Sequence, residues 1–165
     1  MKTKSFLALA ILFCAGAAPP YLDAPKKELF RLQGTWEMEA LEVNGEDVPQ
    51  KKLKGTTLTI KGNKYVVKVK DTEHEVTIEL DPAKDPKAID MYLPDGNEAP
   101  KLARGVYDLD GDTFRICRHQ MAGEDRPRQI GSWPDTNLFV VTWKRKKPWA
   151  WQTTRDGGEE SVLLR

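Results

Sequence analysis

The chain of 165 residues carries 26 basic and 25 acidic side chains, which gives a formal net charge of +1 at pH 7. Its length is typical of one domain. A charge so close to zero excludes the strong positive field by which proteins hold nucleic acid or an anionic membrane surface. With two histidines and two cysteines, the chain is also poor in zinc ligands.

The first residues have the layout of a secretory signal peptide. Lys2 and Lys4 give a positive start, and residues 6–13 are all apolar. Ala15-Gly16-Ala17 then supplies a small-x-small cleavage site. The apolar run is shorter than the roughly 20 residues of a membrane-spanning helix. We therefore expect residues 1–17 to be removed and the mature chain to be extracytoplasmic, periplasmic or secreted, with no integral membrane segment.

Cys14 leaves a second possibility open, which is lipid anchoring as a bacterial lipoprotein. Such signals place a small residue just before the modified cysteine, whereas Phe13 stands there in this chain. Anchoring is therefore the less favoured outcome. Cys117 would then remain as a lone cysteine, which cannot form an internal disulfide. It lies within an apolar strand pattern, which is typical of a buried and unreactive thiol.

A short helix is predicted at the start of the domain. Residues 18–25 are rich in proline and are predicted to be a linker. Pro25 suits the first turn of a helix, and the helix is predicted over residues 26–32. Gly34 is placed to end it. The domain itself is expected to cover residues 26–145.

Beyond this helix, apolar and polar residues alternate with the period of a strand that has one buried face. The first such segment places Trp36, Met38 and Ala40 on one side. Asp110-Gly111 is the strongest hairpin signal. An even number of strands joined by short turns can close into a ring without edges. The sequence therefore predicts an all-β fold, an eight-stranded antiparallel lipocalin-like barrel, which either fills with side chains or holds one small ligand. The predicted strands cover residues 36–40, 57–61, 65–70, 76–80, 89–93, 106–109, 114–116 and 138–143.

Two segments interrupt this regularity. Residues 119–136 form a long connection, and long loops in compact domains are frequently functional. Residues 146–165 form a C-terminal tail that carries Trp149 and Trp151. Grouped aromatic residues are a signal of a protein interface. An alternative function is therefore an extracytoplasmic interaction module, which binds a protein partner through its outer face or its tail.

Several motifs follow one another along the chain. They are Leu32-Gln33-Gly34-Thr35-Trp36, Asp81-Pro82, Pro86-Lys87-Ala88-Ile89-Asp90, Gly105-Val106-Tyr107-Asp108-Leu109-Asp110-Gly111-Asp112-Thr113, Arg126-Pro127 and Lys144-Arg145. In this order they resemble an uncharacterised lipocalin-like domain family that occurs in many copies in planctomycete bacteria. The resemblance covers about residues 27–145. It implies a lipocalin-like fold and export, and it implies no particular activity.

The motif Gly34-Thr35-Trp36 also resembles the opening motif of lipocalins. That resemblance implies that Trp36 closes one end of the barrel and that a late arginine, Arg145 by position, stacks on it. A guanidinium over an indole ring contributes about 0.5 to 2 kcal/mol. Gly34, Trp36 and Arg145 are therefore expected to have a structural role and not to bind a ligand.

The candidate catalytic and metal sites have simpler structural interpretations. The stretch from Asp108 to Asp112 resembles the start of a calcium loop, but its glycine is fourth instead of sixth, so a hairpin is favoured. His74 has no second histidine four residues later, as a zinc-protease motif requires. Cys117 and His119 share one strand face and could form a nucleophile–base pair, but a core cysteine and a rim histidine are favoured. We predict no enzyme activity, no catalytic residue, no metal and no cofactor.

A basic cluster follows the last predicted strand. Residues 144–147 are all lysine or arginine, and Trp143 precedes them. Charge mixed with aromatic side chains is typical of proteins that bind single-stranded nucleic acid. Export and the near-zero net charge argue against that partner. A solvated strand end is favoured, and no nucleic-acid partner is expected.

Arginines gather on one predicted strand and the loop after it. The group consists of Arg115, Arg118, His119, Arg126 and Arg128. The planar fork of arginine suits a carboxylate or a phosphate. Arg118 or Arg126 at the barrel mouth could orient an acidic head group. The favoured alternative is that Arg126 pairs with a local acid, Glu124 or Asp125, or braces the loop through backbone carbonyls.

The leading hypothesis is a non-enzymatic barrel that binds a small apolar or amphiphilic molecule. It is motivated by the closed-barrel pattern and the long loop. Inward-facing side chains would contact the ligand, and an arginine would stand at the rim. The predicted ligand-binding residues are Met38, Tyr65, Met91, Tyr107 and Phe114, with Arg118 or Arg126 at the rim.

Overall fold

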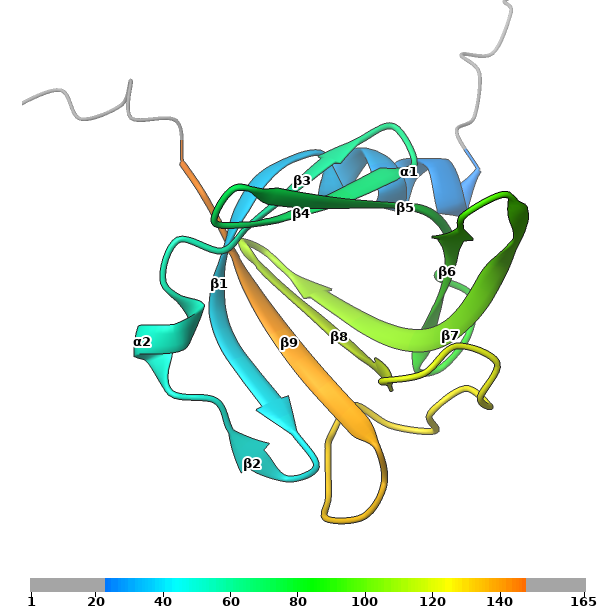
Figure 1. Ribbon diagram of the computed structural model, residues 1–165. Helices are drawn as coiled ribbons and strands as arrows, with labels where there is room; N and C mark the ends of the chain where they lie inside the picture. The colour runs from blue at the N-terminus through cyan, green and yellow to red at the C-terminus, as the bar shows by residue number, and fades with distance from the viewer. Residues whose placement is uncertain (1–22, 148–165) are drawn as a thin grey trace, which may run out of the picture.

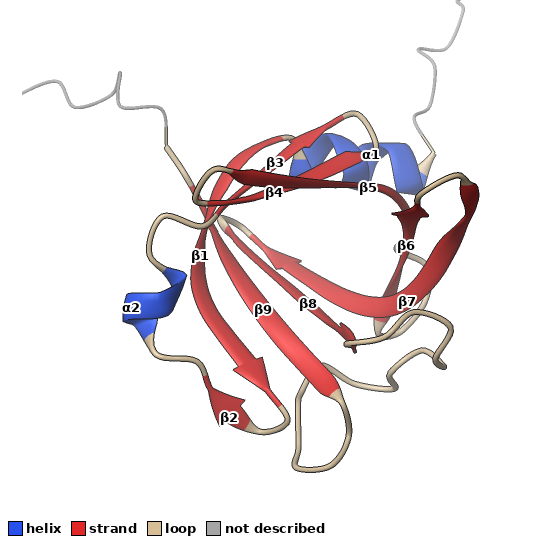
Figure 2. Ribbon diagram, viewed as in Figure 1, coloured by secondary structure: helices blue, strands red, loops and turns tan. Residues whose placement is uncertain are grey.

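The computed structural model describes residues 23–147, which form an antiparallel β-barrel preceded by a short helix (Figure 1). Most of the described chain is strand (Figure 2). The predicted signal peptide, most of the predicted linker and all but two residues of the predicted tail lie outside the described residues. The elements in chain order are α1 (Ala24–Leu32), β1 (Gly34–Val43), β2 (Glu46–Asp47), α2 (Gln50–Leu53), β3 (Thr57–Lys61), β4 (Lys64–Val69), β5 (Thr72–Asp81), β6 (Lys87–Asp95), β7 (Glu98–Asp110), β8 (Thr113–His119) and β9 (Leu138–Arg145).

The barrel closes because β1 pairs along both of its edges. On one side it pairs with β3, where Trp36 lies opposite Leu58. On the other it pairs with β9, where Trp36 lies opposite Arg145. The strands from β3 to β9 follow as antiparallel neighbours in chain order, so eight strands form a closed ring, as the sequence predicts. The short β2 only extends the end of β1 as a small hairpin.

All eight predicted strands are present, but β7, the longest of them, extends well beyond the alternating segment that predicted it. β7 has 13 residues, whereas alternation marks only residues 106–109. The earlier part of β7 begins with four exposed residues, among them Pro100, and its apolar and polar residues do not alternate. β2 and α2 are not predicted, because elements of 2 and 4 residues are too short to show a periodic pattern.

A β-bulge in β1 changes which residues face the interior. The register against β9 shifts between Met38 and Ala40, so one extra residue is accommodated and later side chains exchange faces. The prediction that Ala40 shares the inner face with Trp36 and Met38 is therefore wrong, and Ala40 is exposed. Leu41 instead packs against the interior core.

α1 begins at Ala24, two residues before its predicted start. The side chain of Asp23 accepts a hydrogen bond from the backbone N–H of Lys26 at 3.1 Å, which caps the helix. Pro25 stands in the first turn, as predicted. No helix within residues 23–147 combines the length and the apolar character needed to cross a membrane.

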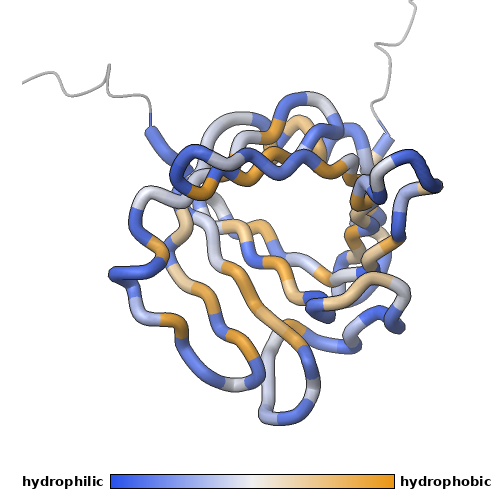
Figure 3. Tube along the Cα trace, viewed as in Figure 1, coloured by the Kyte–Doolittle hydropathy of each residue, from blue (hydrophilic) through white to orange (hydrophobic). Residues whose placement is uncertain are grey.

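The main core lies inside the barrel, toward the end that α1 covers. Hydrophobic and hydrophilic positions alternate along the strands (Figure 3), and the inward set forms this core. The ring of Phe114 meets those of Trp36 and Tyr107, with centroids 5.8 and 6.0 Å away. Leu32 of α1 is fully buried in the same cluster. Because these side chains fill the interior, we call this the closed end of the barrel.

The part of the connection between β8 and β9 that contains Ile130 packs against the outside of the barrel (Figure 1). Its Ile130 covers a second, smaller core of outward-facing residues. The thiol of Cys117 is buried there and donates to the carbonyl of Gly131 at 3.2 Å. Burial raises the pKa of this thiol, which disfavours the thiolate. Cys117 is buried as predicted, but it lies under the loop and not inside the barrel.

Candidate functional site

The closed end is sealed by the stacking of Arg145 on Trp36. The guanidinium carbon lies 4.0 Å from the centroid of the indole ring, because pairing of β1 with β9 places the two residues opposite each other. Gly34 has a φ of +116°, a conformation that favours glycine, and a Cβ there would lie 3.6 Å from Nη1 of Arg145. The predicted closure by Gly34, Trp36 and Arg145 agrees with this geometry.

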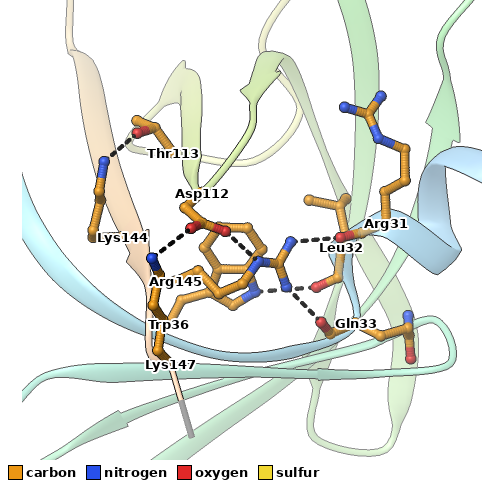
Figure 4. A network of polar contacts seen from close by, with 9 residues as sticks. All are labelled: Arg31, Leu32, Gln33, Trp36, Asp112, Thr113, Lys144, Arg145 and Lys147. Carbon is orange, nitrogen blue, oxygen red and sulfur yellow. Dashed lines mark hydrogen bonds and ion pairs between the residues drawn. The ribbon is translucent and has the colours of Figure 1, made fainter. Parts of the chain in front are cut away.

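Arg145 also fastens α1 to this end of the barrel (Figure 4). Its Nη1 and Nη2 donate to the backbone carbonyls of Gln33 and Arg31 at 2.8 and 2.6 Å. Its Nε donates to the carboxylate of Asp112 at 3.1 Å. Carbonyls at a helix end need partners of this kind. All three nitrogens of the Arg145 guanidinium are thus engaged within the protein, which is consistent with a structural role.

The opposite end of the barrel holds a cavity of about 400 Å³. This volume is within the range of small-molecule sites. At roughly 30 Å³ per water molecule, the cavity would hold about thirteen waters, or a ligand with a similar number of non-hydrogen atoms. We call it the barrel cavity, and its wall is mostly hydrocarbon. The lining residues are Met38, Leu41, Val43, Tyr65, Val67, Met91, Ile116, Arg118, Gln120, Phe139, Val141 and Trp143.

Four of the predicted ligand residues line the barrel cavity, namely Met38, Tyr65, Met91 and Arg118. They come from four strands, β1, β4, β6 and β8. Each stands at an inward position, because side chains alternate between the two faces of a strand. The alternation in the sequence therefore brings these four residues together.

Tyr107 and Phe114 do not line the barrel cavity. Both are at most 1% exposed, in the core between the cavity and the closed end. They face inward as predicted, but the alternation of a strand does not say how deep in the barrel a residue lies. Here the edge-to-face contact of the two rings and the contact of Phe114 with Trp36 fill the interior. We therefore treat both residues as core residues.

Arg126 lies against the outer wall of the barrel, away from its mouth. Its guanidinium forms an ion pair with Asp90 of β6 at 2.6 Å. It also donates to the backbone carbonyls of Ile89 and Gly105. The prediction of a ligand contact at the rim is wrong in this respect, because Asp90 stands at an outward position of β6. The predicted contact with backbone carbonyls is present, whereas the acid that pairs with Arg126 is distant in sequence.

Eight lining residues were not predicted. For Val67, Ile116, Val141 and Trp143, the sequence signal was available, because each stands at an inward position of a predicted strand. Leu41 and Val43 follow the bulge, which alternation does not reveal. Phe139 also stands at an inward position of a predicted strand, and Gln120 lies in the first position of the loop after β8.

Among residues 23–147, Arg118 is the one charged side chain in the lining of the barrel cavity. Its guanidinium lies over the ring of Phe139, 4.6 Å from the centroid. Its Nη1 donates to the backbone carbonyls of His119 and Gln120 at 2.7 and 3.3 Å. Burial lowers the pKa of Arg118, but an arginine keeps its proton in proteins. The wall of this apolar cavity therefore carries a positive charge.

Arg118 differs from Arg126 and Arg145, which are also partly buried, in lacking an acidic partner. Arg126 pairs with Asp90 at 2.6 Å, and Arg145 pairs with Asp112 at 3.1 Å. Among the residues that the structure describes, no carboxylate lies within ion-pair distance of Arg118. Removing an unpaired charge from water costs free energy. The barrel cavity thus contains a cation whose charge the described chain does not balance.

Tyr65 and Trp143 add two uncharged donors to the same cavity wall. Their rings meet edge to face, with centroids 6.5 Å apart. Burial raises the pKa of Tyr65, against the opposing field of Arg118. The indole N–H of Trp143 lies beside the hydroxyl of Tyr65 but makes no hydrogen bond of normal geometry to a described residue. Together with Arg118, these groups favour a ligand that brings hydrogen-bond acceptors.

The other candidate sites from the sequence are dispersed over the surface. His74 is exposed on β5, and Asp112 in the hairpin after β7 accepts from Arg145. The amines of Lys146 and Lys147 lie 3.1 and 3.8 Å from acidic side chains, as in a solvated strand end. Within residues 23–147, no three histidine, cysteine or acidic side chains gather closely enough to hold a metal ion.

Comparisons with known proteins identify no relative of this chain. No family model matches it, and neither a curated protein nor a solved structure matches it. The resemblance to the planctomycete lipocalin-like family therefore stays a prediction from the motifs. The function has to be argued from the barrel cavity itself.

Proposed function

We propose that this protein is an exported, lipocalin-like domain that binds one small apolar or amphiphilic molecule in the barrel cavity, without catalysing a reaction. The observation that supports the proposal most is an apolar cavity of about 400 Å³ inside a closed barrel. A site of this size, with mostly hydrocarbon walls and a few polar groups, is typical of small-ligand binding. The export part of the proposal depends on the signal-peptide pattern of residues 1–17.

The polar groups in the lining of the barrel cavity are better suited to ligand binding than to catalysis. Of its polar lining groups, Arg118 is a permanent cation, Tyr65 has a raised pKa, and Gln120 does not titrate. None of these is suited to act as a general base near neutral pH. What the lining offers is an apolar surface with oriented donors. Those features orient a bound molecule.

Binding can be tested with 1-aminoanthracene, an uncharged dye whose emission rises in apolar surroundings. We expect the full chain to bind this dye with saturation at one dye per protein. The substitution Val67→Trp should fill part of the cavity and weaken dye binding at least tenfold. Val66→Trp is the matched control, because Val66 is the neighbour on the outer face of β4 and is similarly half-buried. Absence of dye binding, or equal weakening by both substitutions, would contradict the proposal.

The alternative of a protein interaction module has less support in the described residues. The two most exposed large apolar side chains are Phe30 and Met121, at 75% and 71% exposure. Phe30 belongs to α1 at the closed end, and Met121 lies just beyond β8 at the other end. They do not form one continuous patch. Trp149 and Trp151, on which the predicted tail interface depends, lie outside the described residues.

A further inference from the structure

The position of Arg118 in the barrel indicates what the ligand should carry. Arg118 faces inward on β8 near the end of the strand, where it pairs with Phe139 of β9. Ile116, two residues earlier on the same face, lines the cavity below it. The charge therefore stands toward the open end of the barrel, and hydrocarbon lies deeper inside. This arrangement matches a molecule with a polar head and an apolar body.

The guanidinium is held in a defined position with part of its donor set unused. Phe139 supports one face of it, and Nη1 is engaged by the carbonyls of His119 and Gln120. Among the described residues, no acceptor engages its Nε or Nη2. That free edge is the planar pair of donors that binds a carboxylate through two parallel hydrogen bonds. The fixed position reduces the entropy that a ligand would have to remove.

Packing alone gives no reason for an arginine at this position. A leucine would fill an apolar cavity wall without the cost of removing a charge from water. Arg126 and Arg145 are also partly buried, and an aspartate of the same chain compensates each of them. We therefore expect the ligand itself to carry the negative charge that compensates Arg118.

Building on the proposed binding function, we propose that the ligand carries a carboxylate, which Arg118 binds at the open end while the apolar part of the ligand occupies the barrel cavity. The hydroxyl of Tyr65 is a further hydrogen-bond donor on the same wall of the barrel cavity, and the positive charge of Arg118 acts on it. The free edge of Arg118 and the size of the cavity together define the ligand class. It is a monocarboxylic acid with about ten to fifteen non-hydrogen atoms, from about 400 Å³ at roughly 30 Å³ each.

The test compares three probes with the same chain length and different head groups: decanoate, 1-decanol and decyltrimethylammonium. Each competes with 1-aminoanthracene for the full-length protein at pH 8. Hydrogen bonds to a charged group contribute enough for decanoate to bind at least tenfold more tightly than 1-decanol. Decyltrimethylammonium should bind most weakly, because its charge repels that of Arg118. In Arg118→Gln we expect the preference for decanoate over 1-decanol to disappear.

Arg115→Gln is the matched control. Arg115 is an exposed arginine on the outer face of the same strand, so its removal changes the net charge equally without touching the cavity. It should leave the preference for decanoate intact. Retained binding of 1-decanol shows that each variant is folded with an open cavity.

The possible outcomes separate this inference from the function on which it depends. If 1-aminoanthracene and 1-decanol bind but decanoate binds no more tightly, the carboxylate site is wrong and the apolar binding function stands. The same conclusion follows if Arg115→Gln and Arg118→Gln weaken decanoate equally. If neither uncharged probe binds, the proposed function and the carboxylate site are both wrong.

Discussion

The two ends of this barrel use the same arrangement of an arginine on an aromatic ring, with different outcomes. At the closed end, Arg145 lies 4.0 Å from the ring centroid of Trp36. At the open end, Arg118 lies 4.6 Å from that of Phe139. Each guanidinium also donates to two backbone carbonyls. Arg145 has a carboxylate partner, Asp112, whereas Arg118 has none among the described residues.

The difference shows how one side-chain type can seal a barrel or leave it open to a ligand. The bonds of Arg145 join the helix α1, the strand β9 and the hairpin after β7 (Figure 4). An arginine with this set of partners stabilises the fold. Arg118 contacts only its own strand end and a neighbouring ring, so its removal leaves no element unattached. Substitutions at the two ends should therefore separate stability from binding.

The largest expected effect is on stability, at the closed end. Trp36→Ala removes a fully buried indole, which contacts Phe114 and donates to the carbonyl of Leu32 at 3.0 Å. We expect the free energy of unfolding to fall by about 3 to 5 kcal/mol, as for other buried aromatic residues. Phe139→Ala, at the open end, should cost less than half as much, because Phe139 is only partly buried. Urea unfolding followed by circular dichroism measures the free energy of unfolding of both variants. Equal losses would contradict the predicted difference between the two ends of the barrel.

A second prediction concerns the two arginines themselves. Arg145→Gln should lower the free energy of unfolding by about 2 kcal/mol or more, since it removes the cation over Trp36 and charged hydrogen bonds. Arg118→Gln should change the free energy of unfolding by less than about 0.5 kcal/mol, or raise it, because the variant buries no unpaired charge on folding. The same urea experiment compares them. If Arg118→Gln is the more damaging of the two, Arg118 has a structural role.

The smallest expected effect is on the pH dependence of stability. Burial raises the pKa of Tyr65 near the cavity and of Tyr107 in the closed-end core. Above the ordinary tyrosine pKa of 10.0, the unfolded chain loses these protons while the folded chain keeps them. Stability present below that pH is therefore lost as the pH rises.

Tyr65→Phe and Tyr107→Phe should each reduce this alkaline loss, by at most about 1.4 kcal/mol per pH unit above pH 10. Urea unfolding between pH 8 and pH 11 gives the slope. Tyr92→Phe provides a comparison, because the pKa of Tyr92 is raised first by the hydrogen bond to Glu79 at the surface and only second by burial. A slope unchanged in both buried variants would show that the two tyrosines ionise alike in the folded and unfolded chains.

Much of the fold could be predicted because alternation and turn residues are local properties. Each strand carries its own period, and Asp110-Gly111 marks its hairpin without reference to the rest of the chain. The closure by Trp36 and Arg145 was also predictable, from a motif at one end and an arginine at the other. The candidate site was predictable only in part. Depth in the barrel separates Met38 and Met91 from Phe114, and alternation carries no information about depth.

Arg126 and Arg118 show the same limit among charged residues. Nothing near Arg126 in the sequence indicates that Asp90, far away along the chain, lies beside it on the outer wall. Nothing near Arg118 in the sequence indicates that it has no acidic neighbour in the described part of the chain. The bulge after Met38, which turns Leu41 inward, also has no local signature. Each of these facts depends on how distant strands are aligned.

The all-β barrel, the number of its strands and the short helix before them could be read from the amino-acid sequence, because periodicity and turn chemistry act between neighbours in the chain. The pair that seals one end was implied by the resemblance of Gly34-Thr35-Trp36 to the opening motif of lipocalins. Where the interior is filled and where it stays open became known from the folded chain alone. The same holds for the charges: Arg126 and Arg145 each pair with an aspartate, whereas Arg118 lines the barrel cavity without an acidic partner among the described residues. The reason is physical: cavity volume and charge pairing depend on distances between strands, and those distances are fixed only when the ring closes.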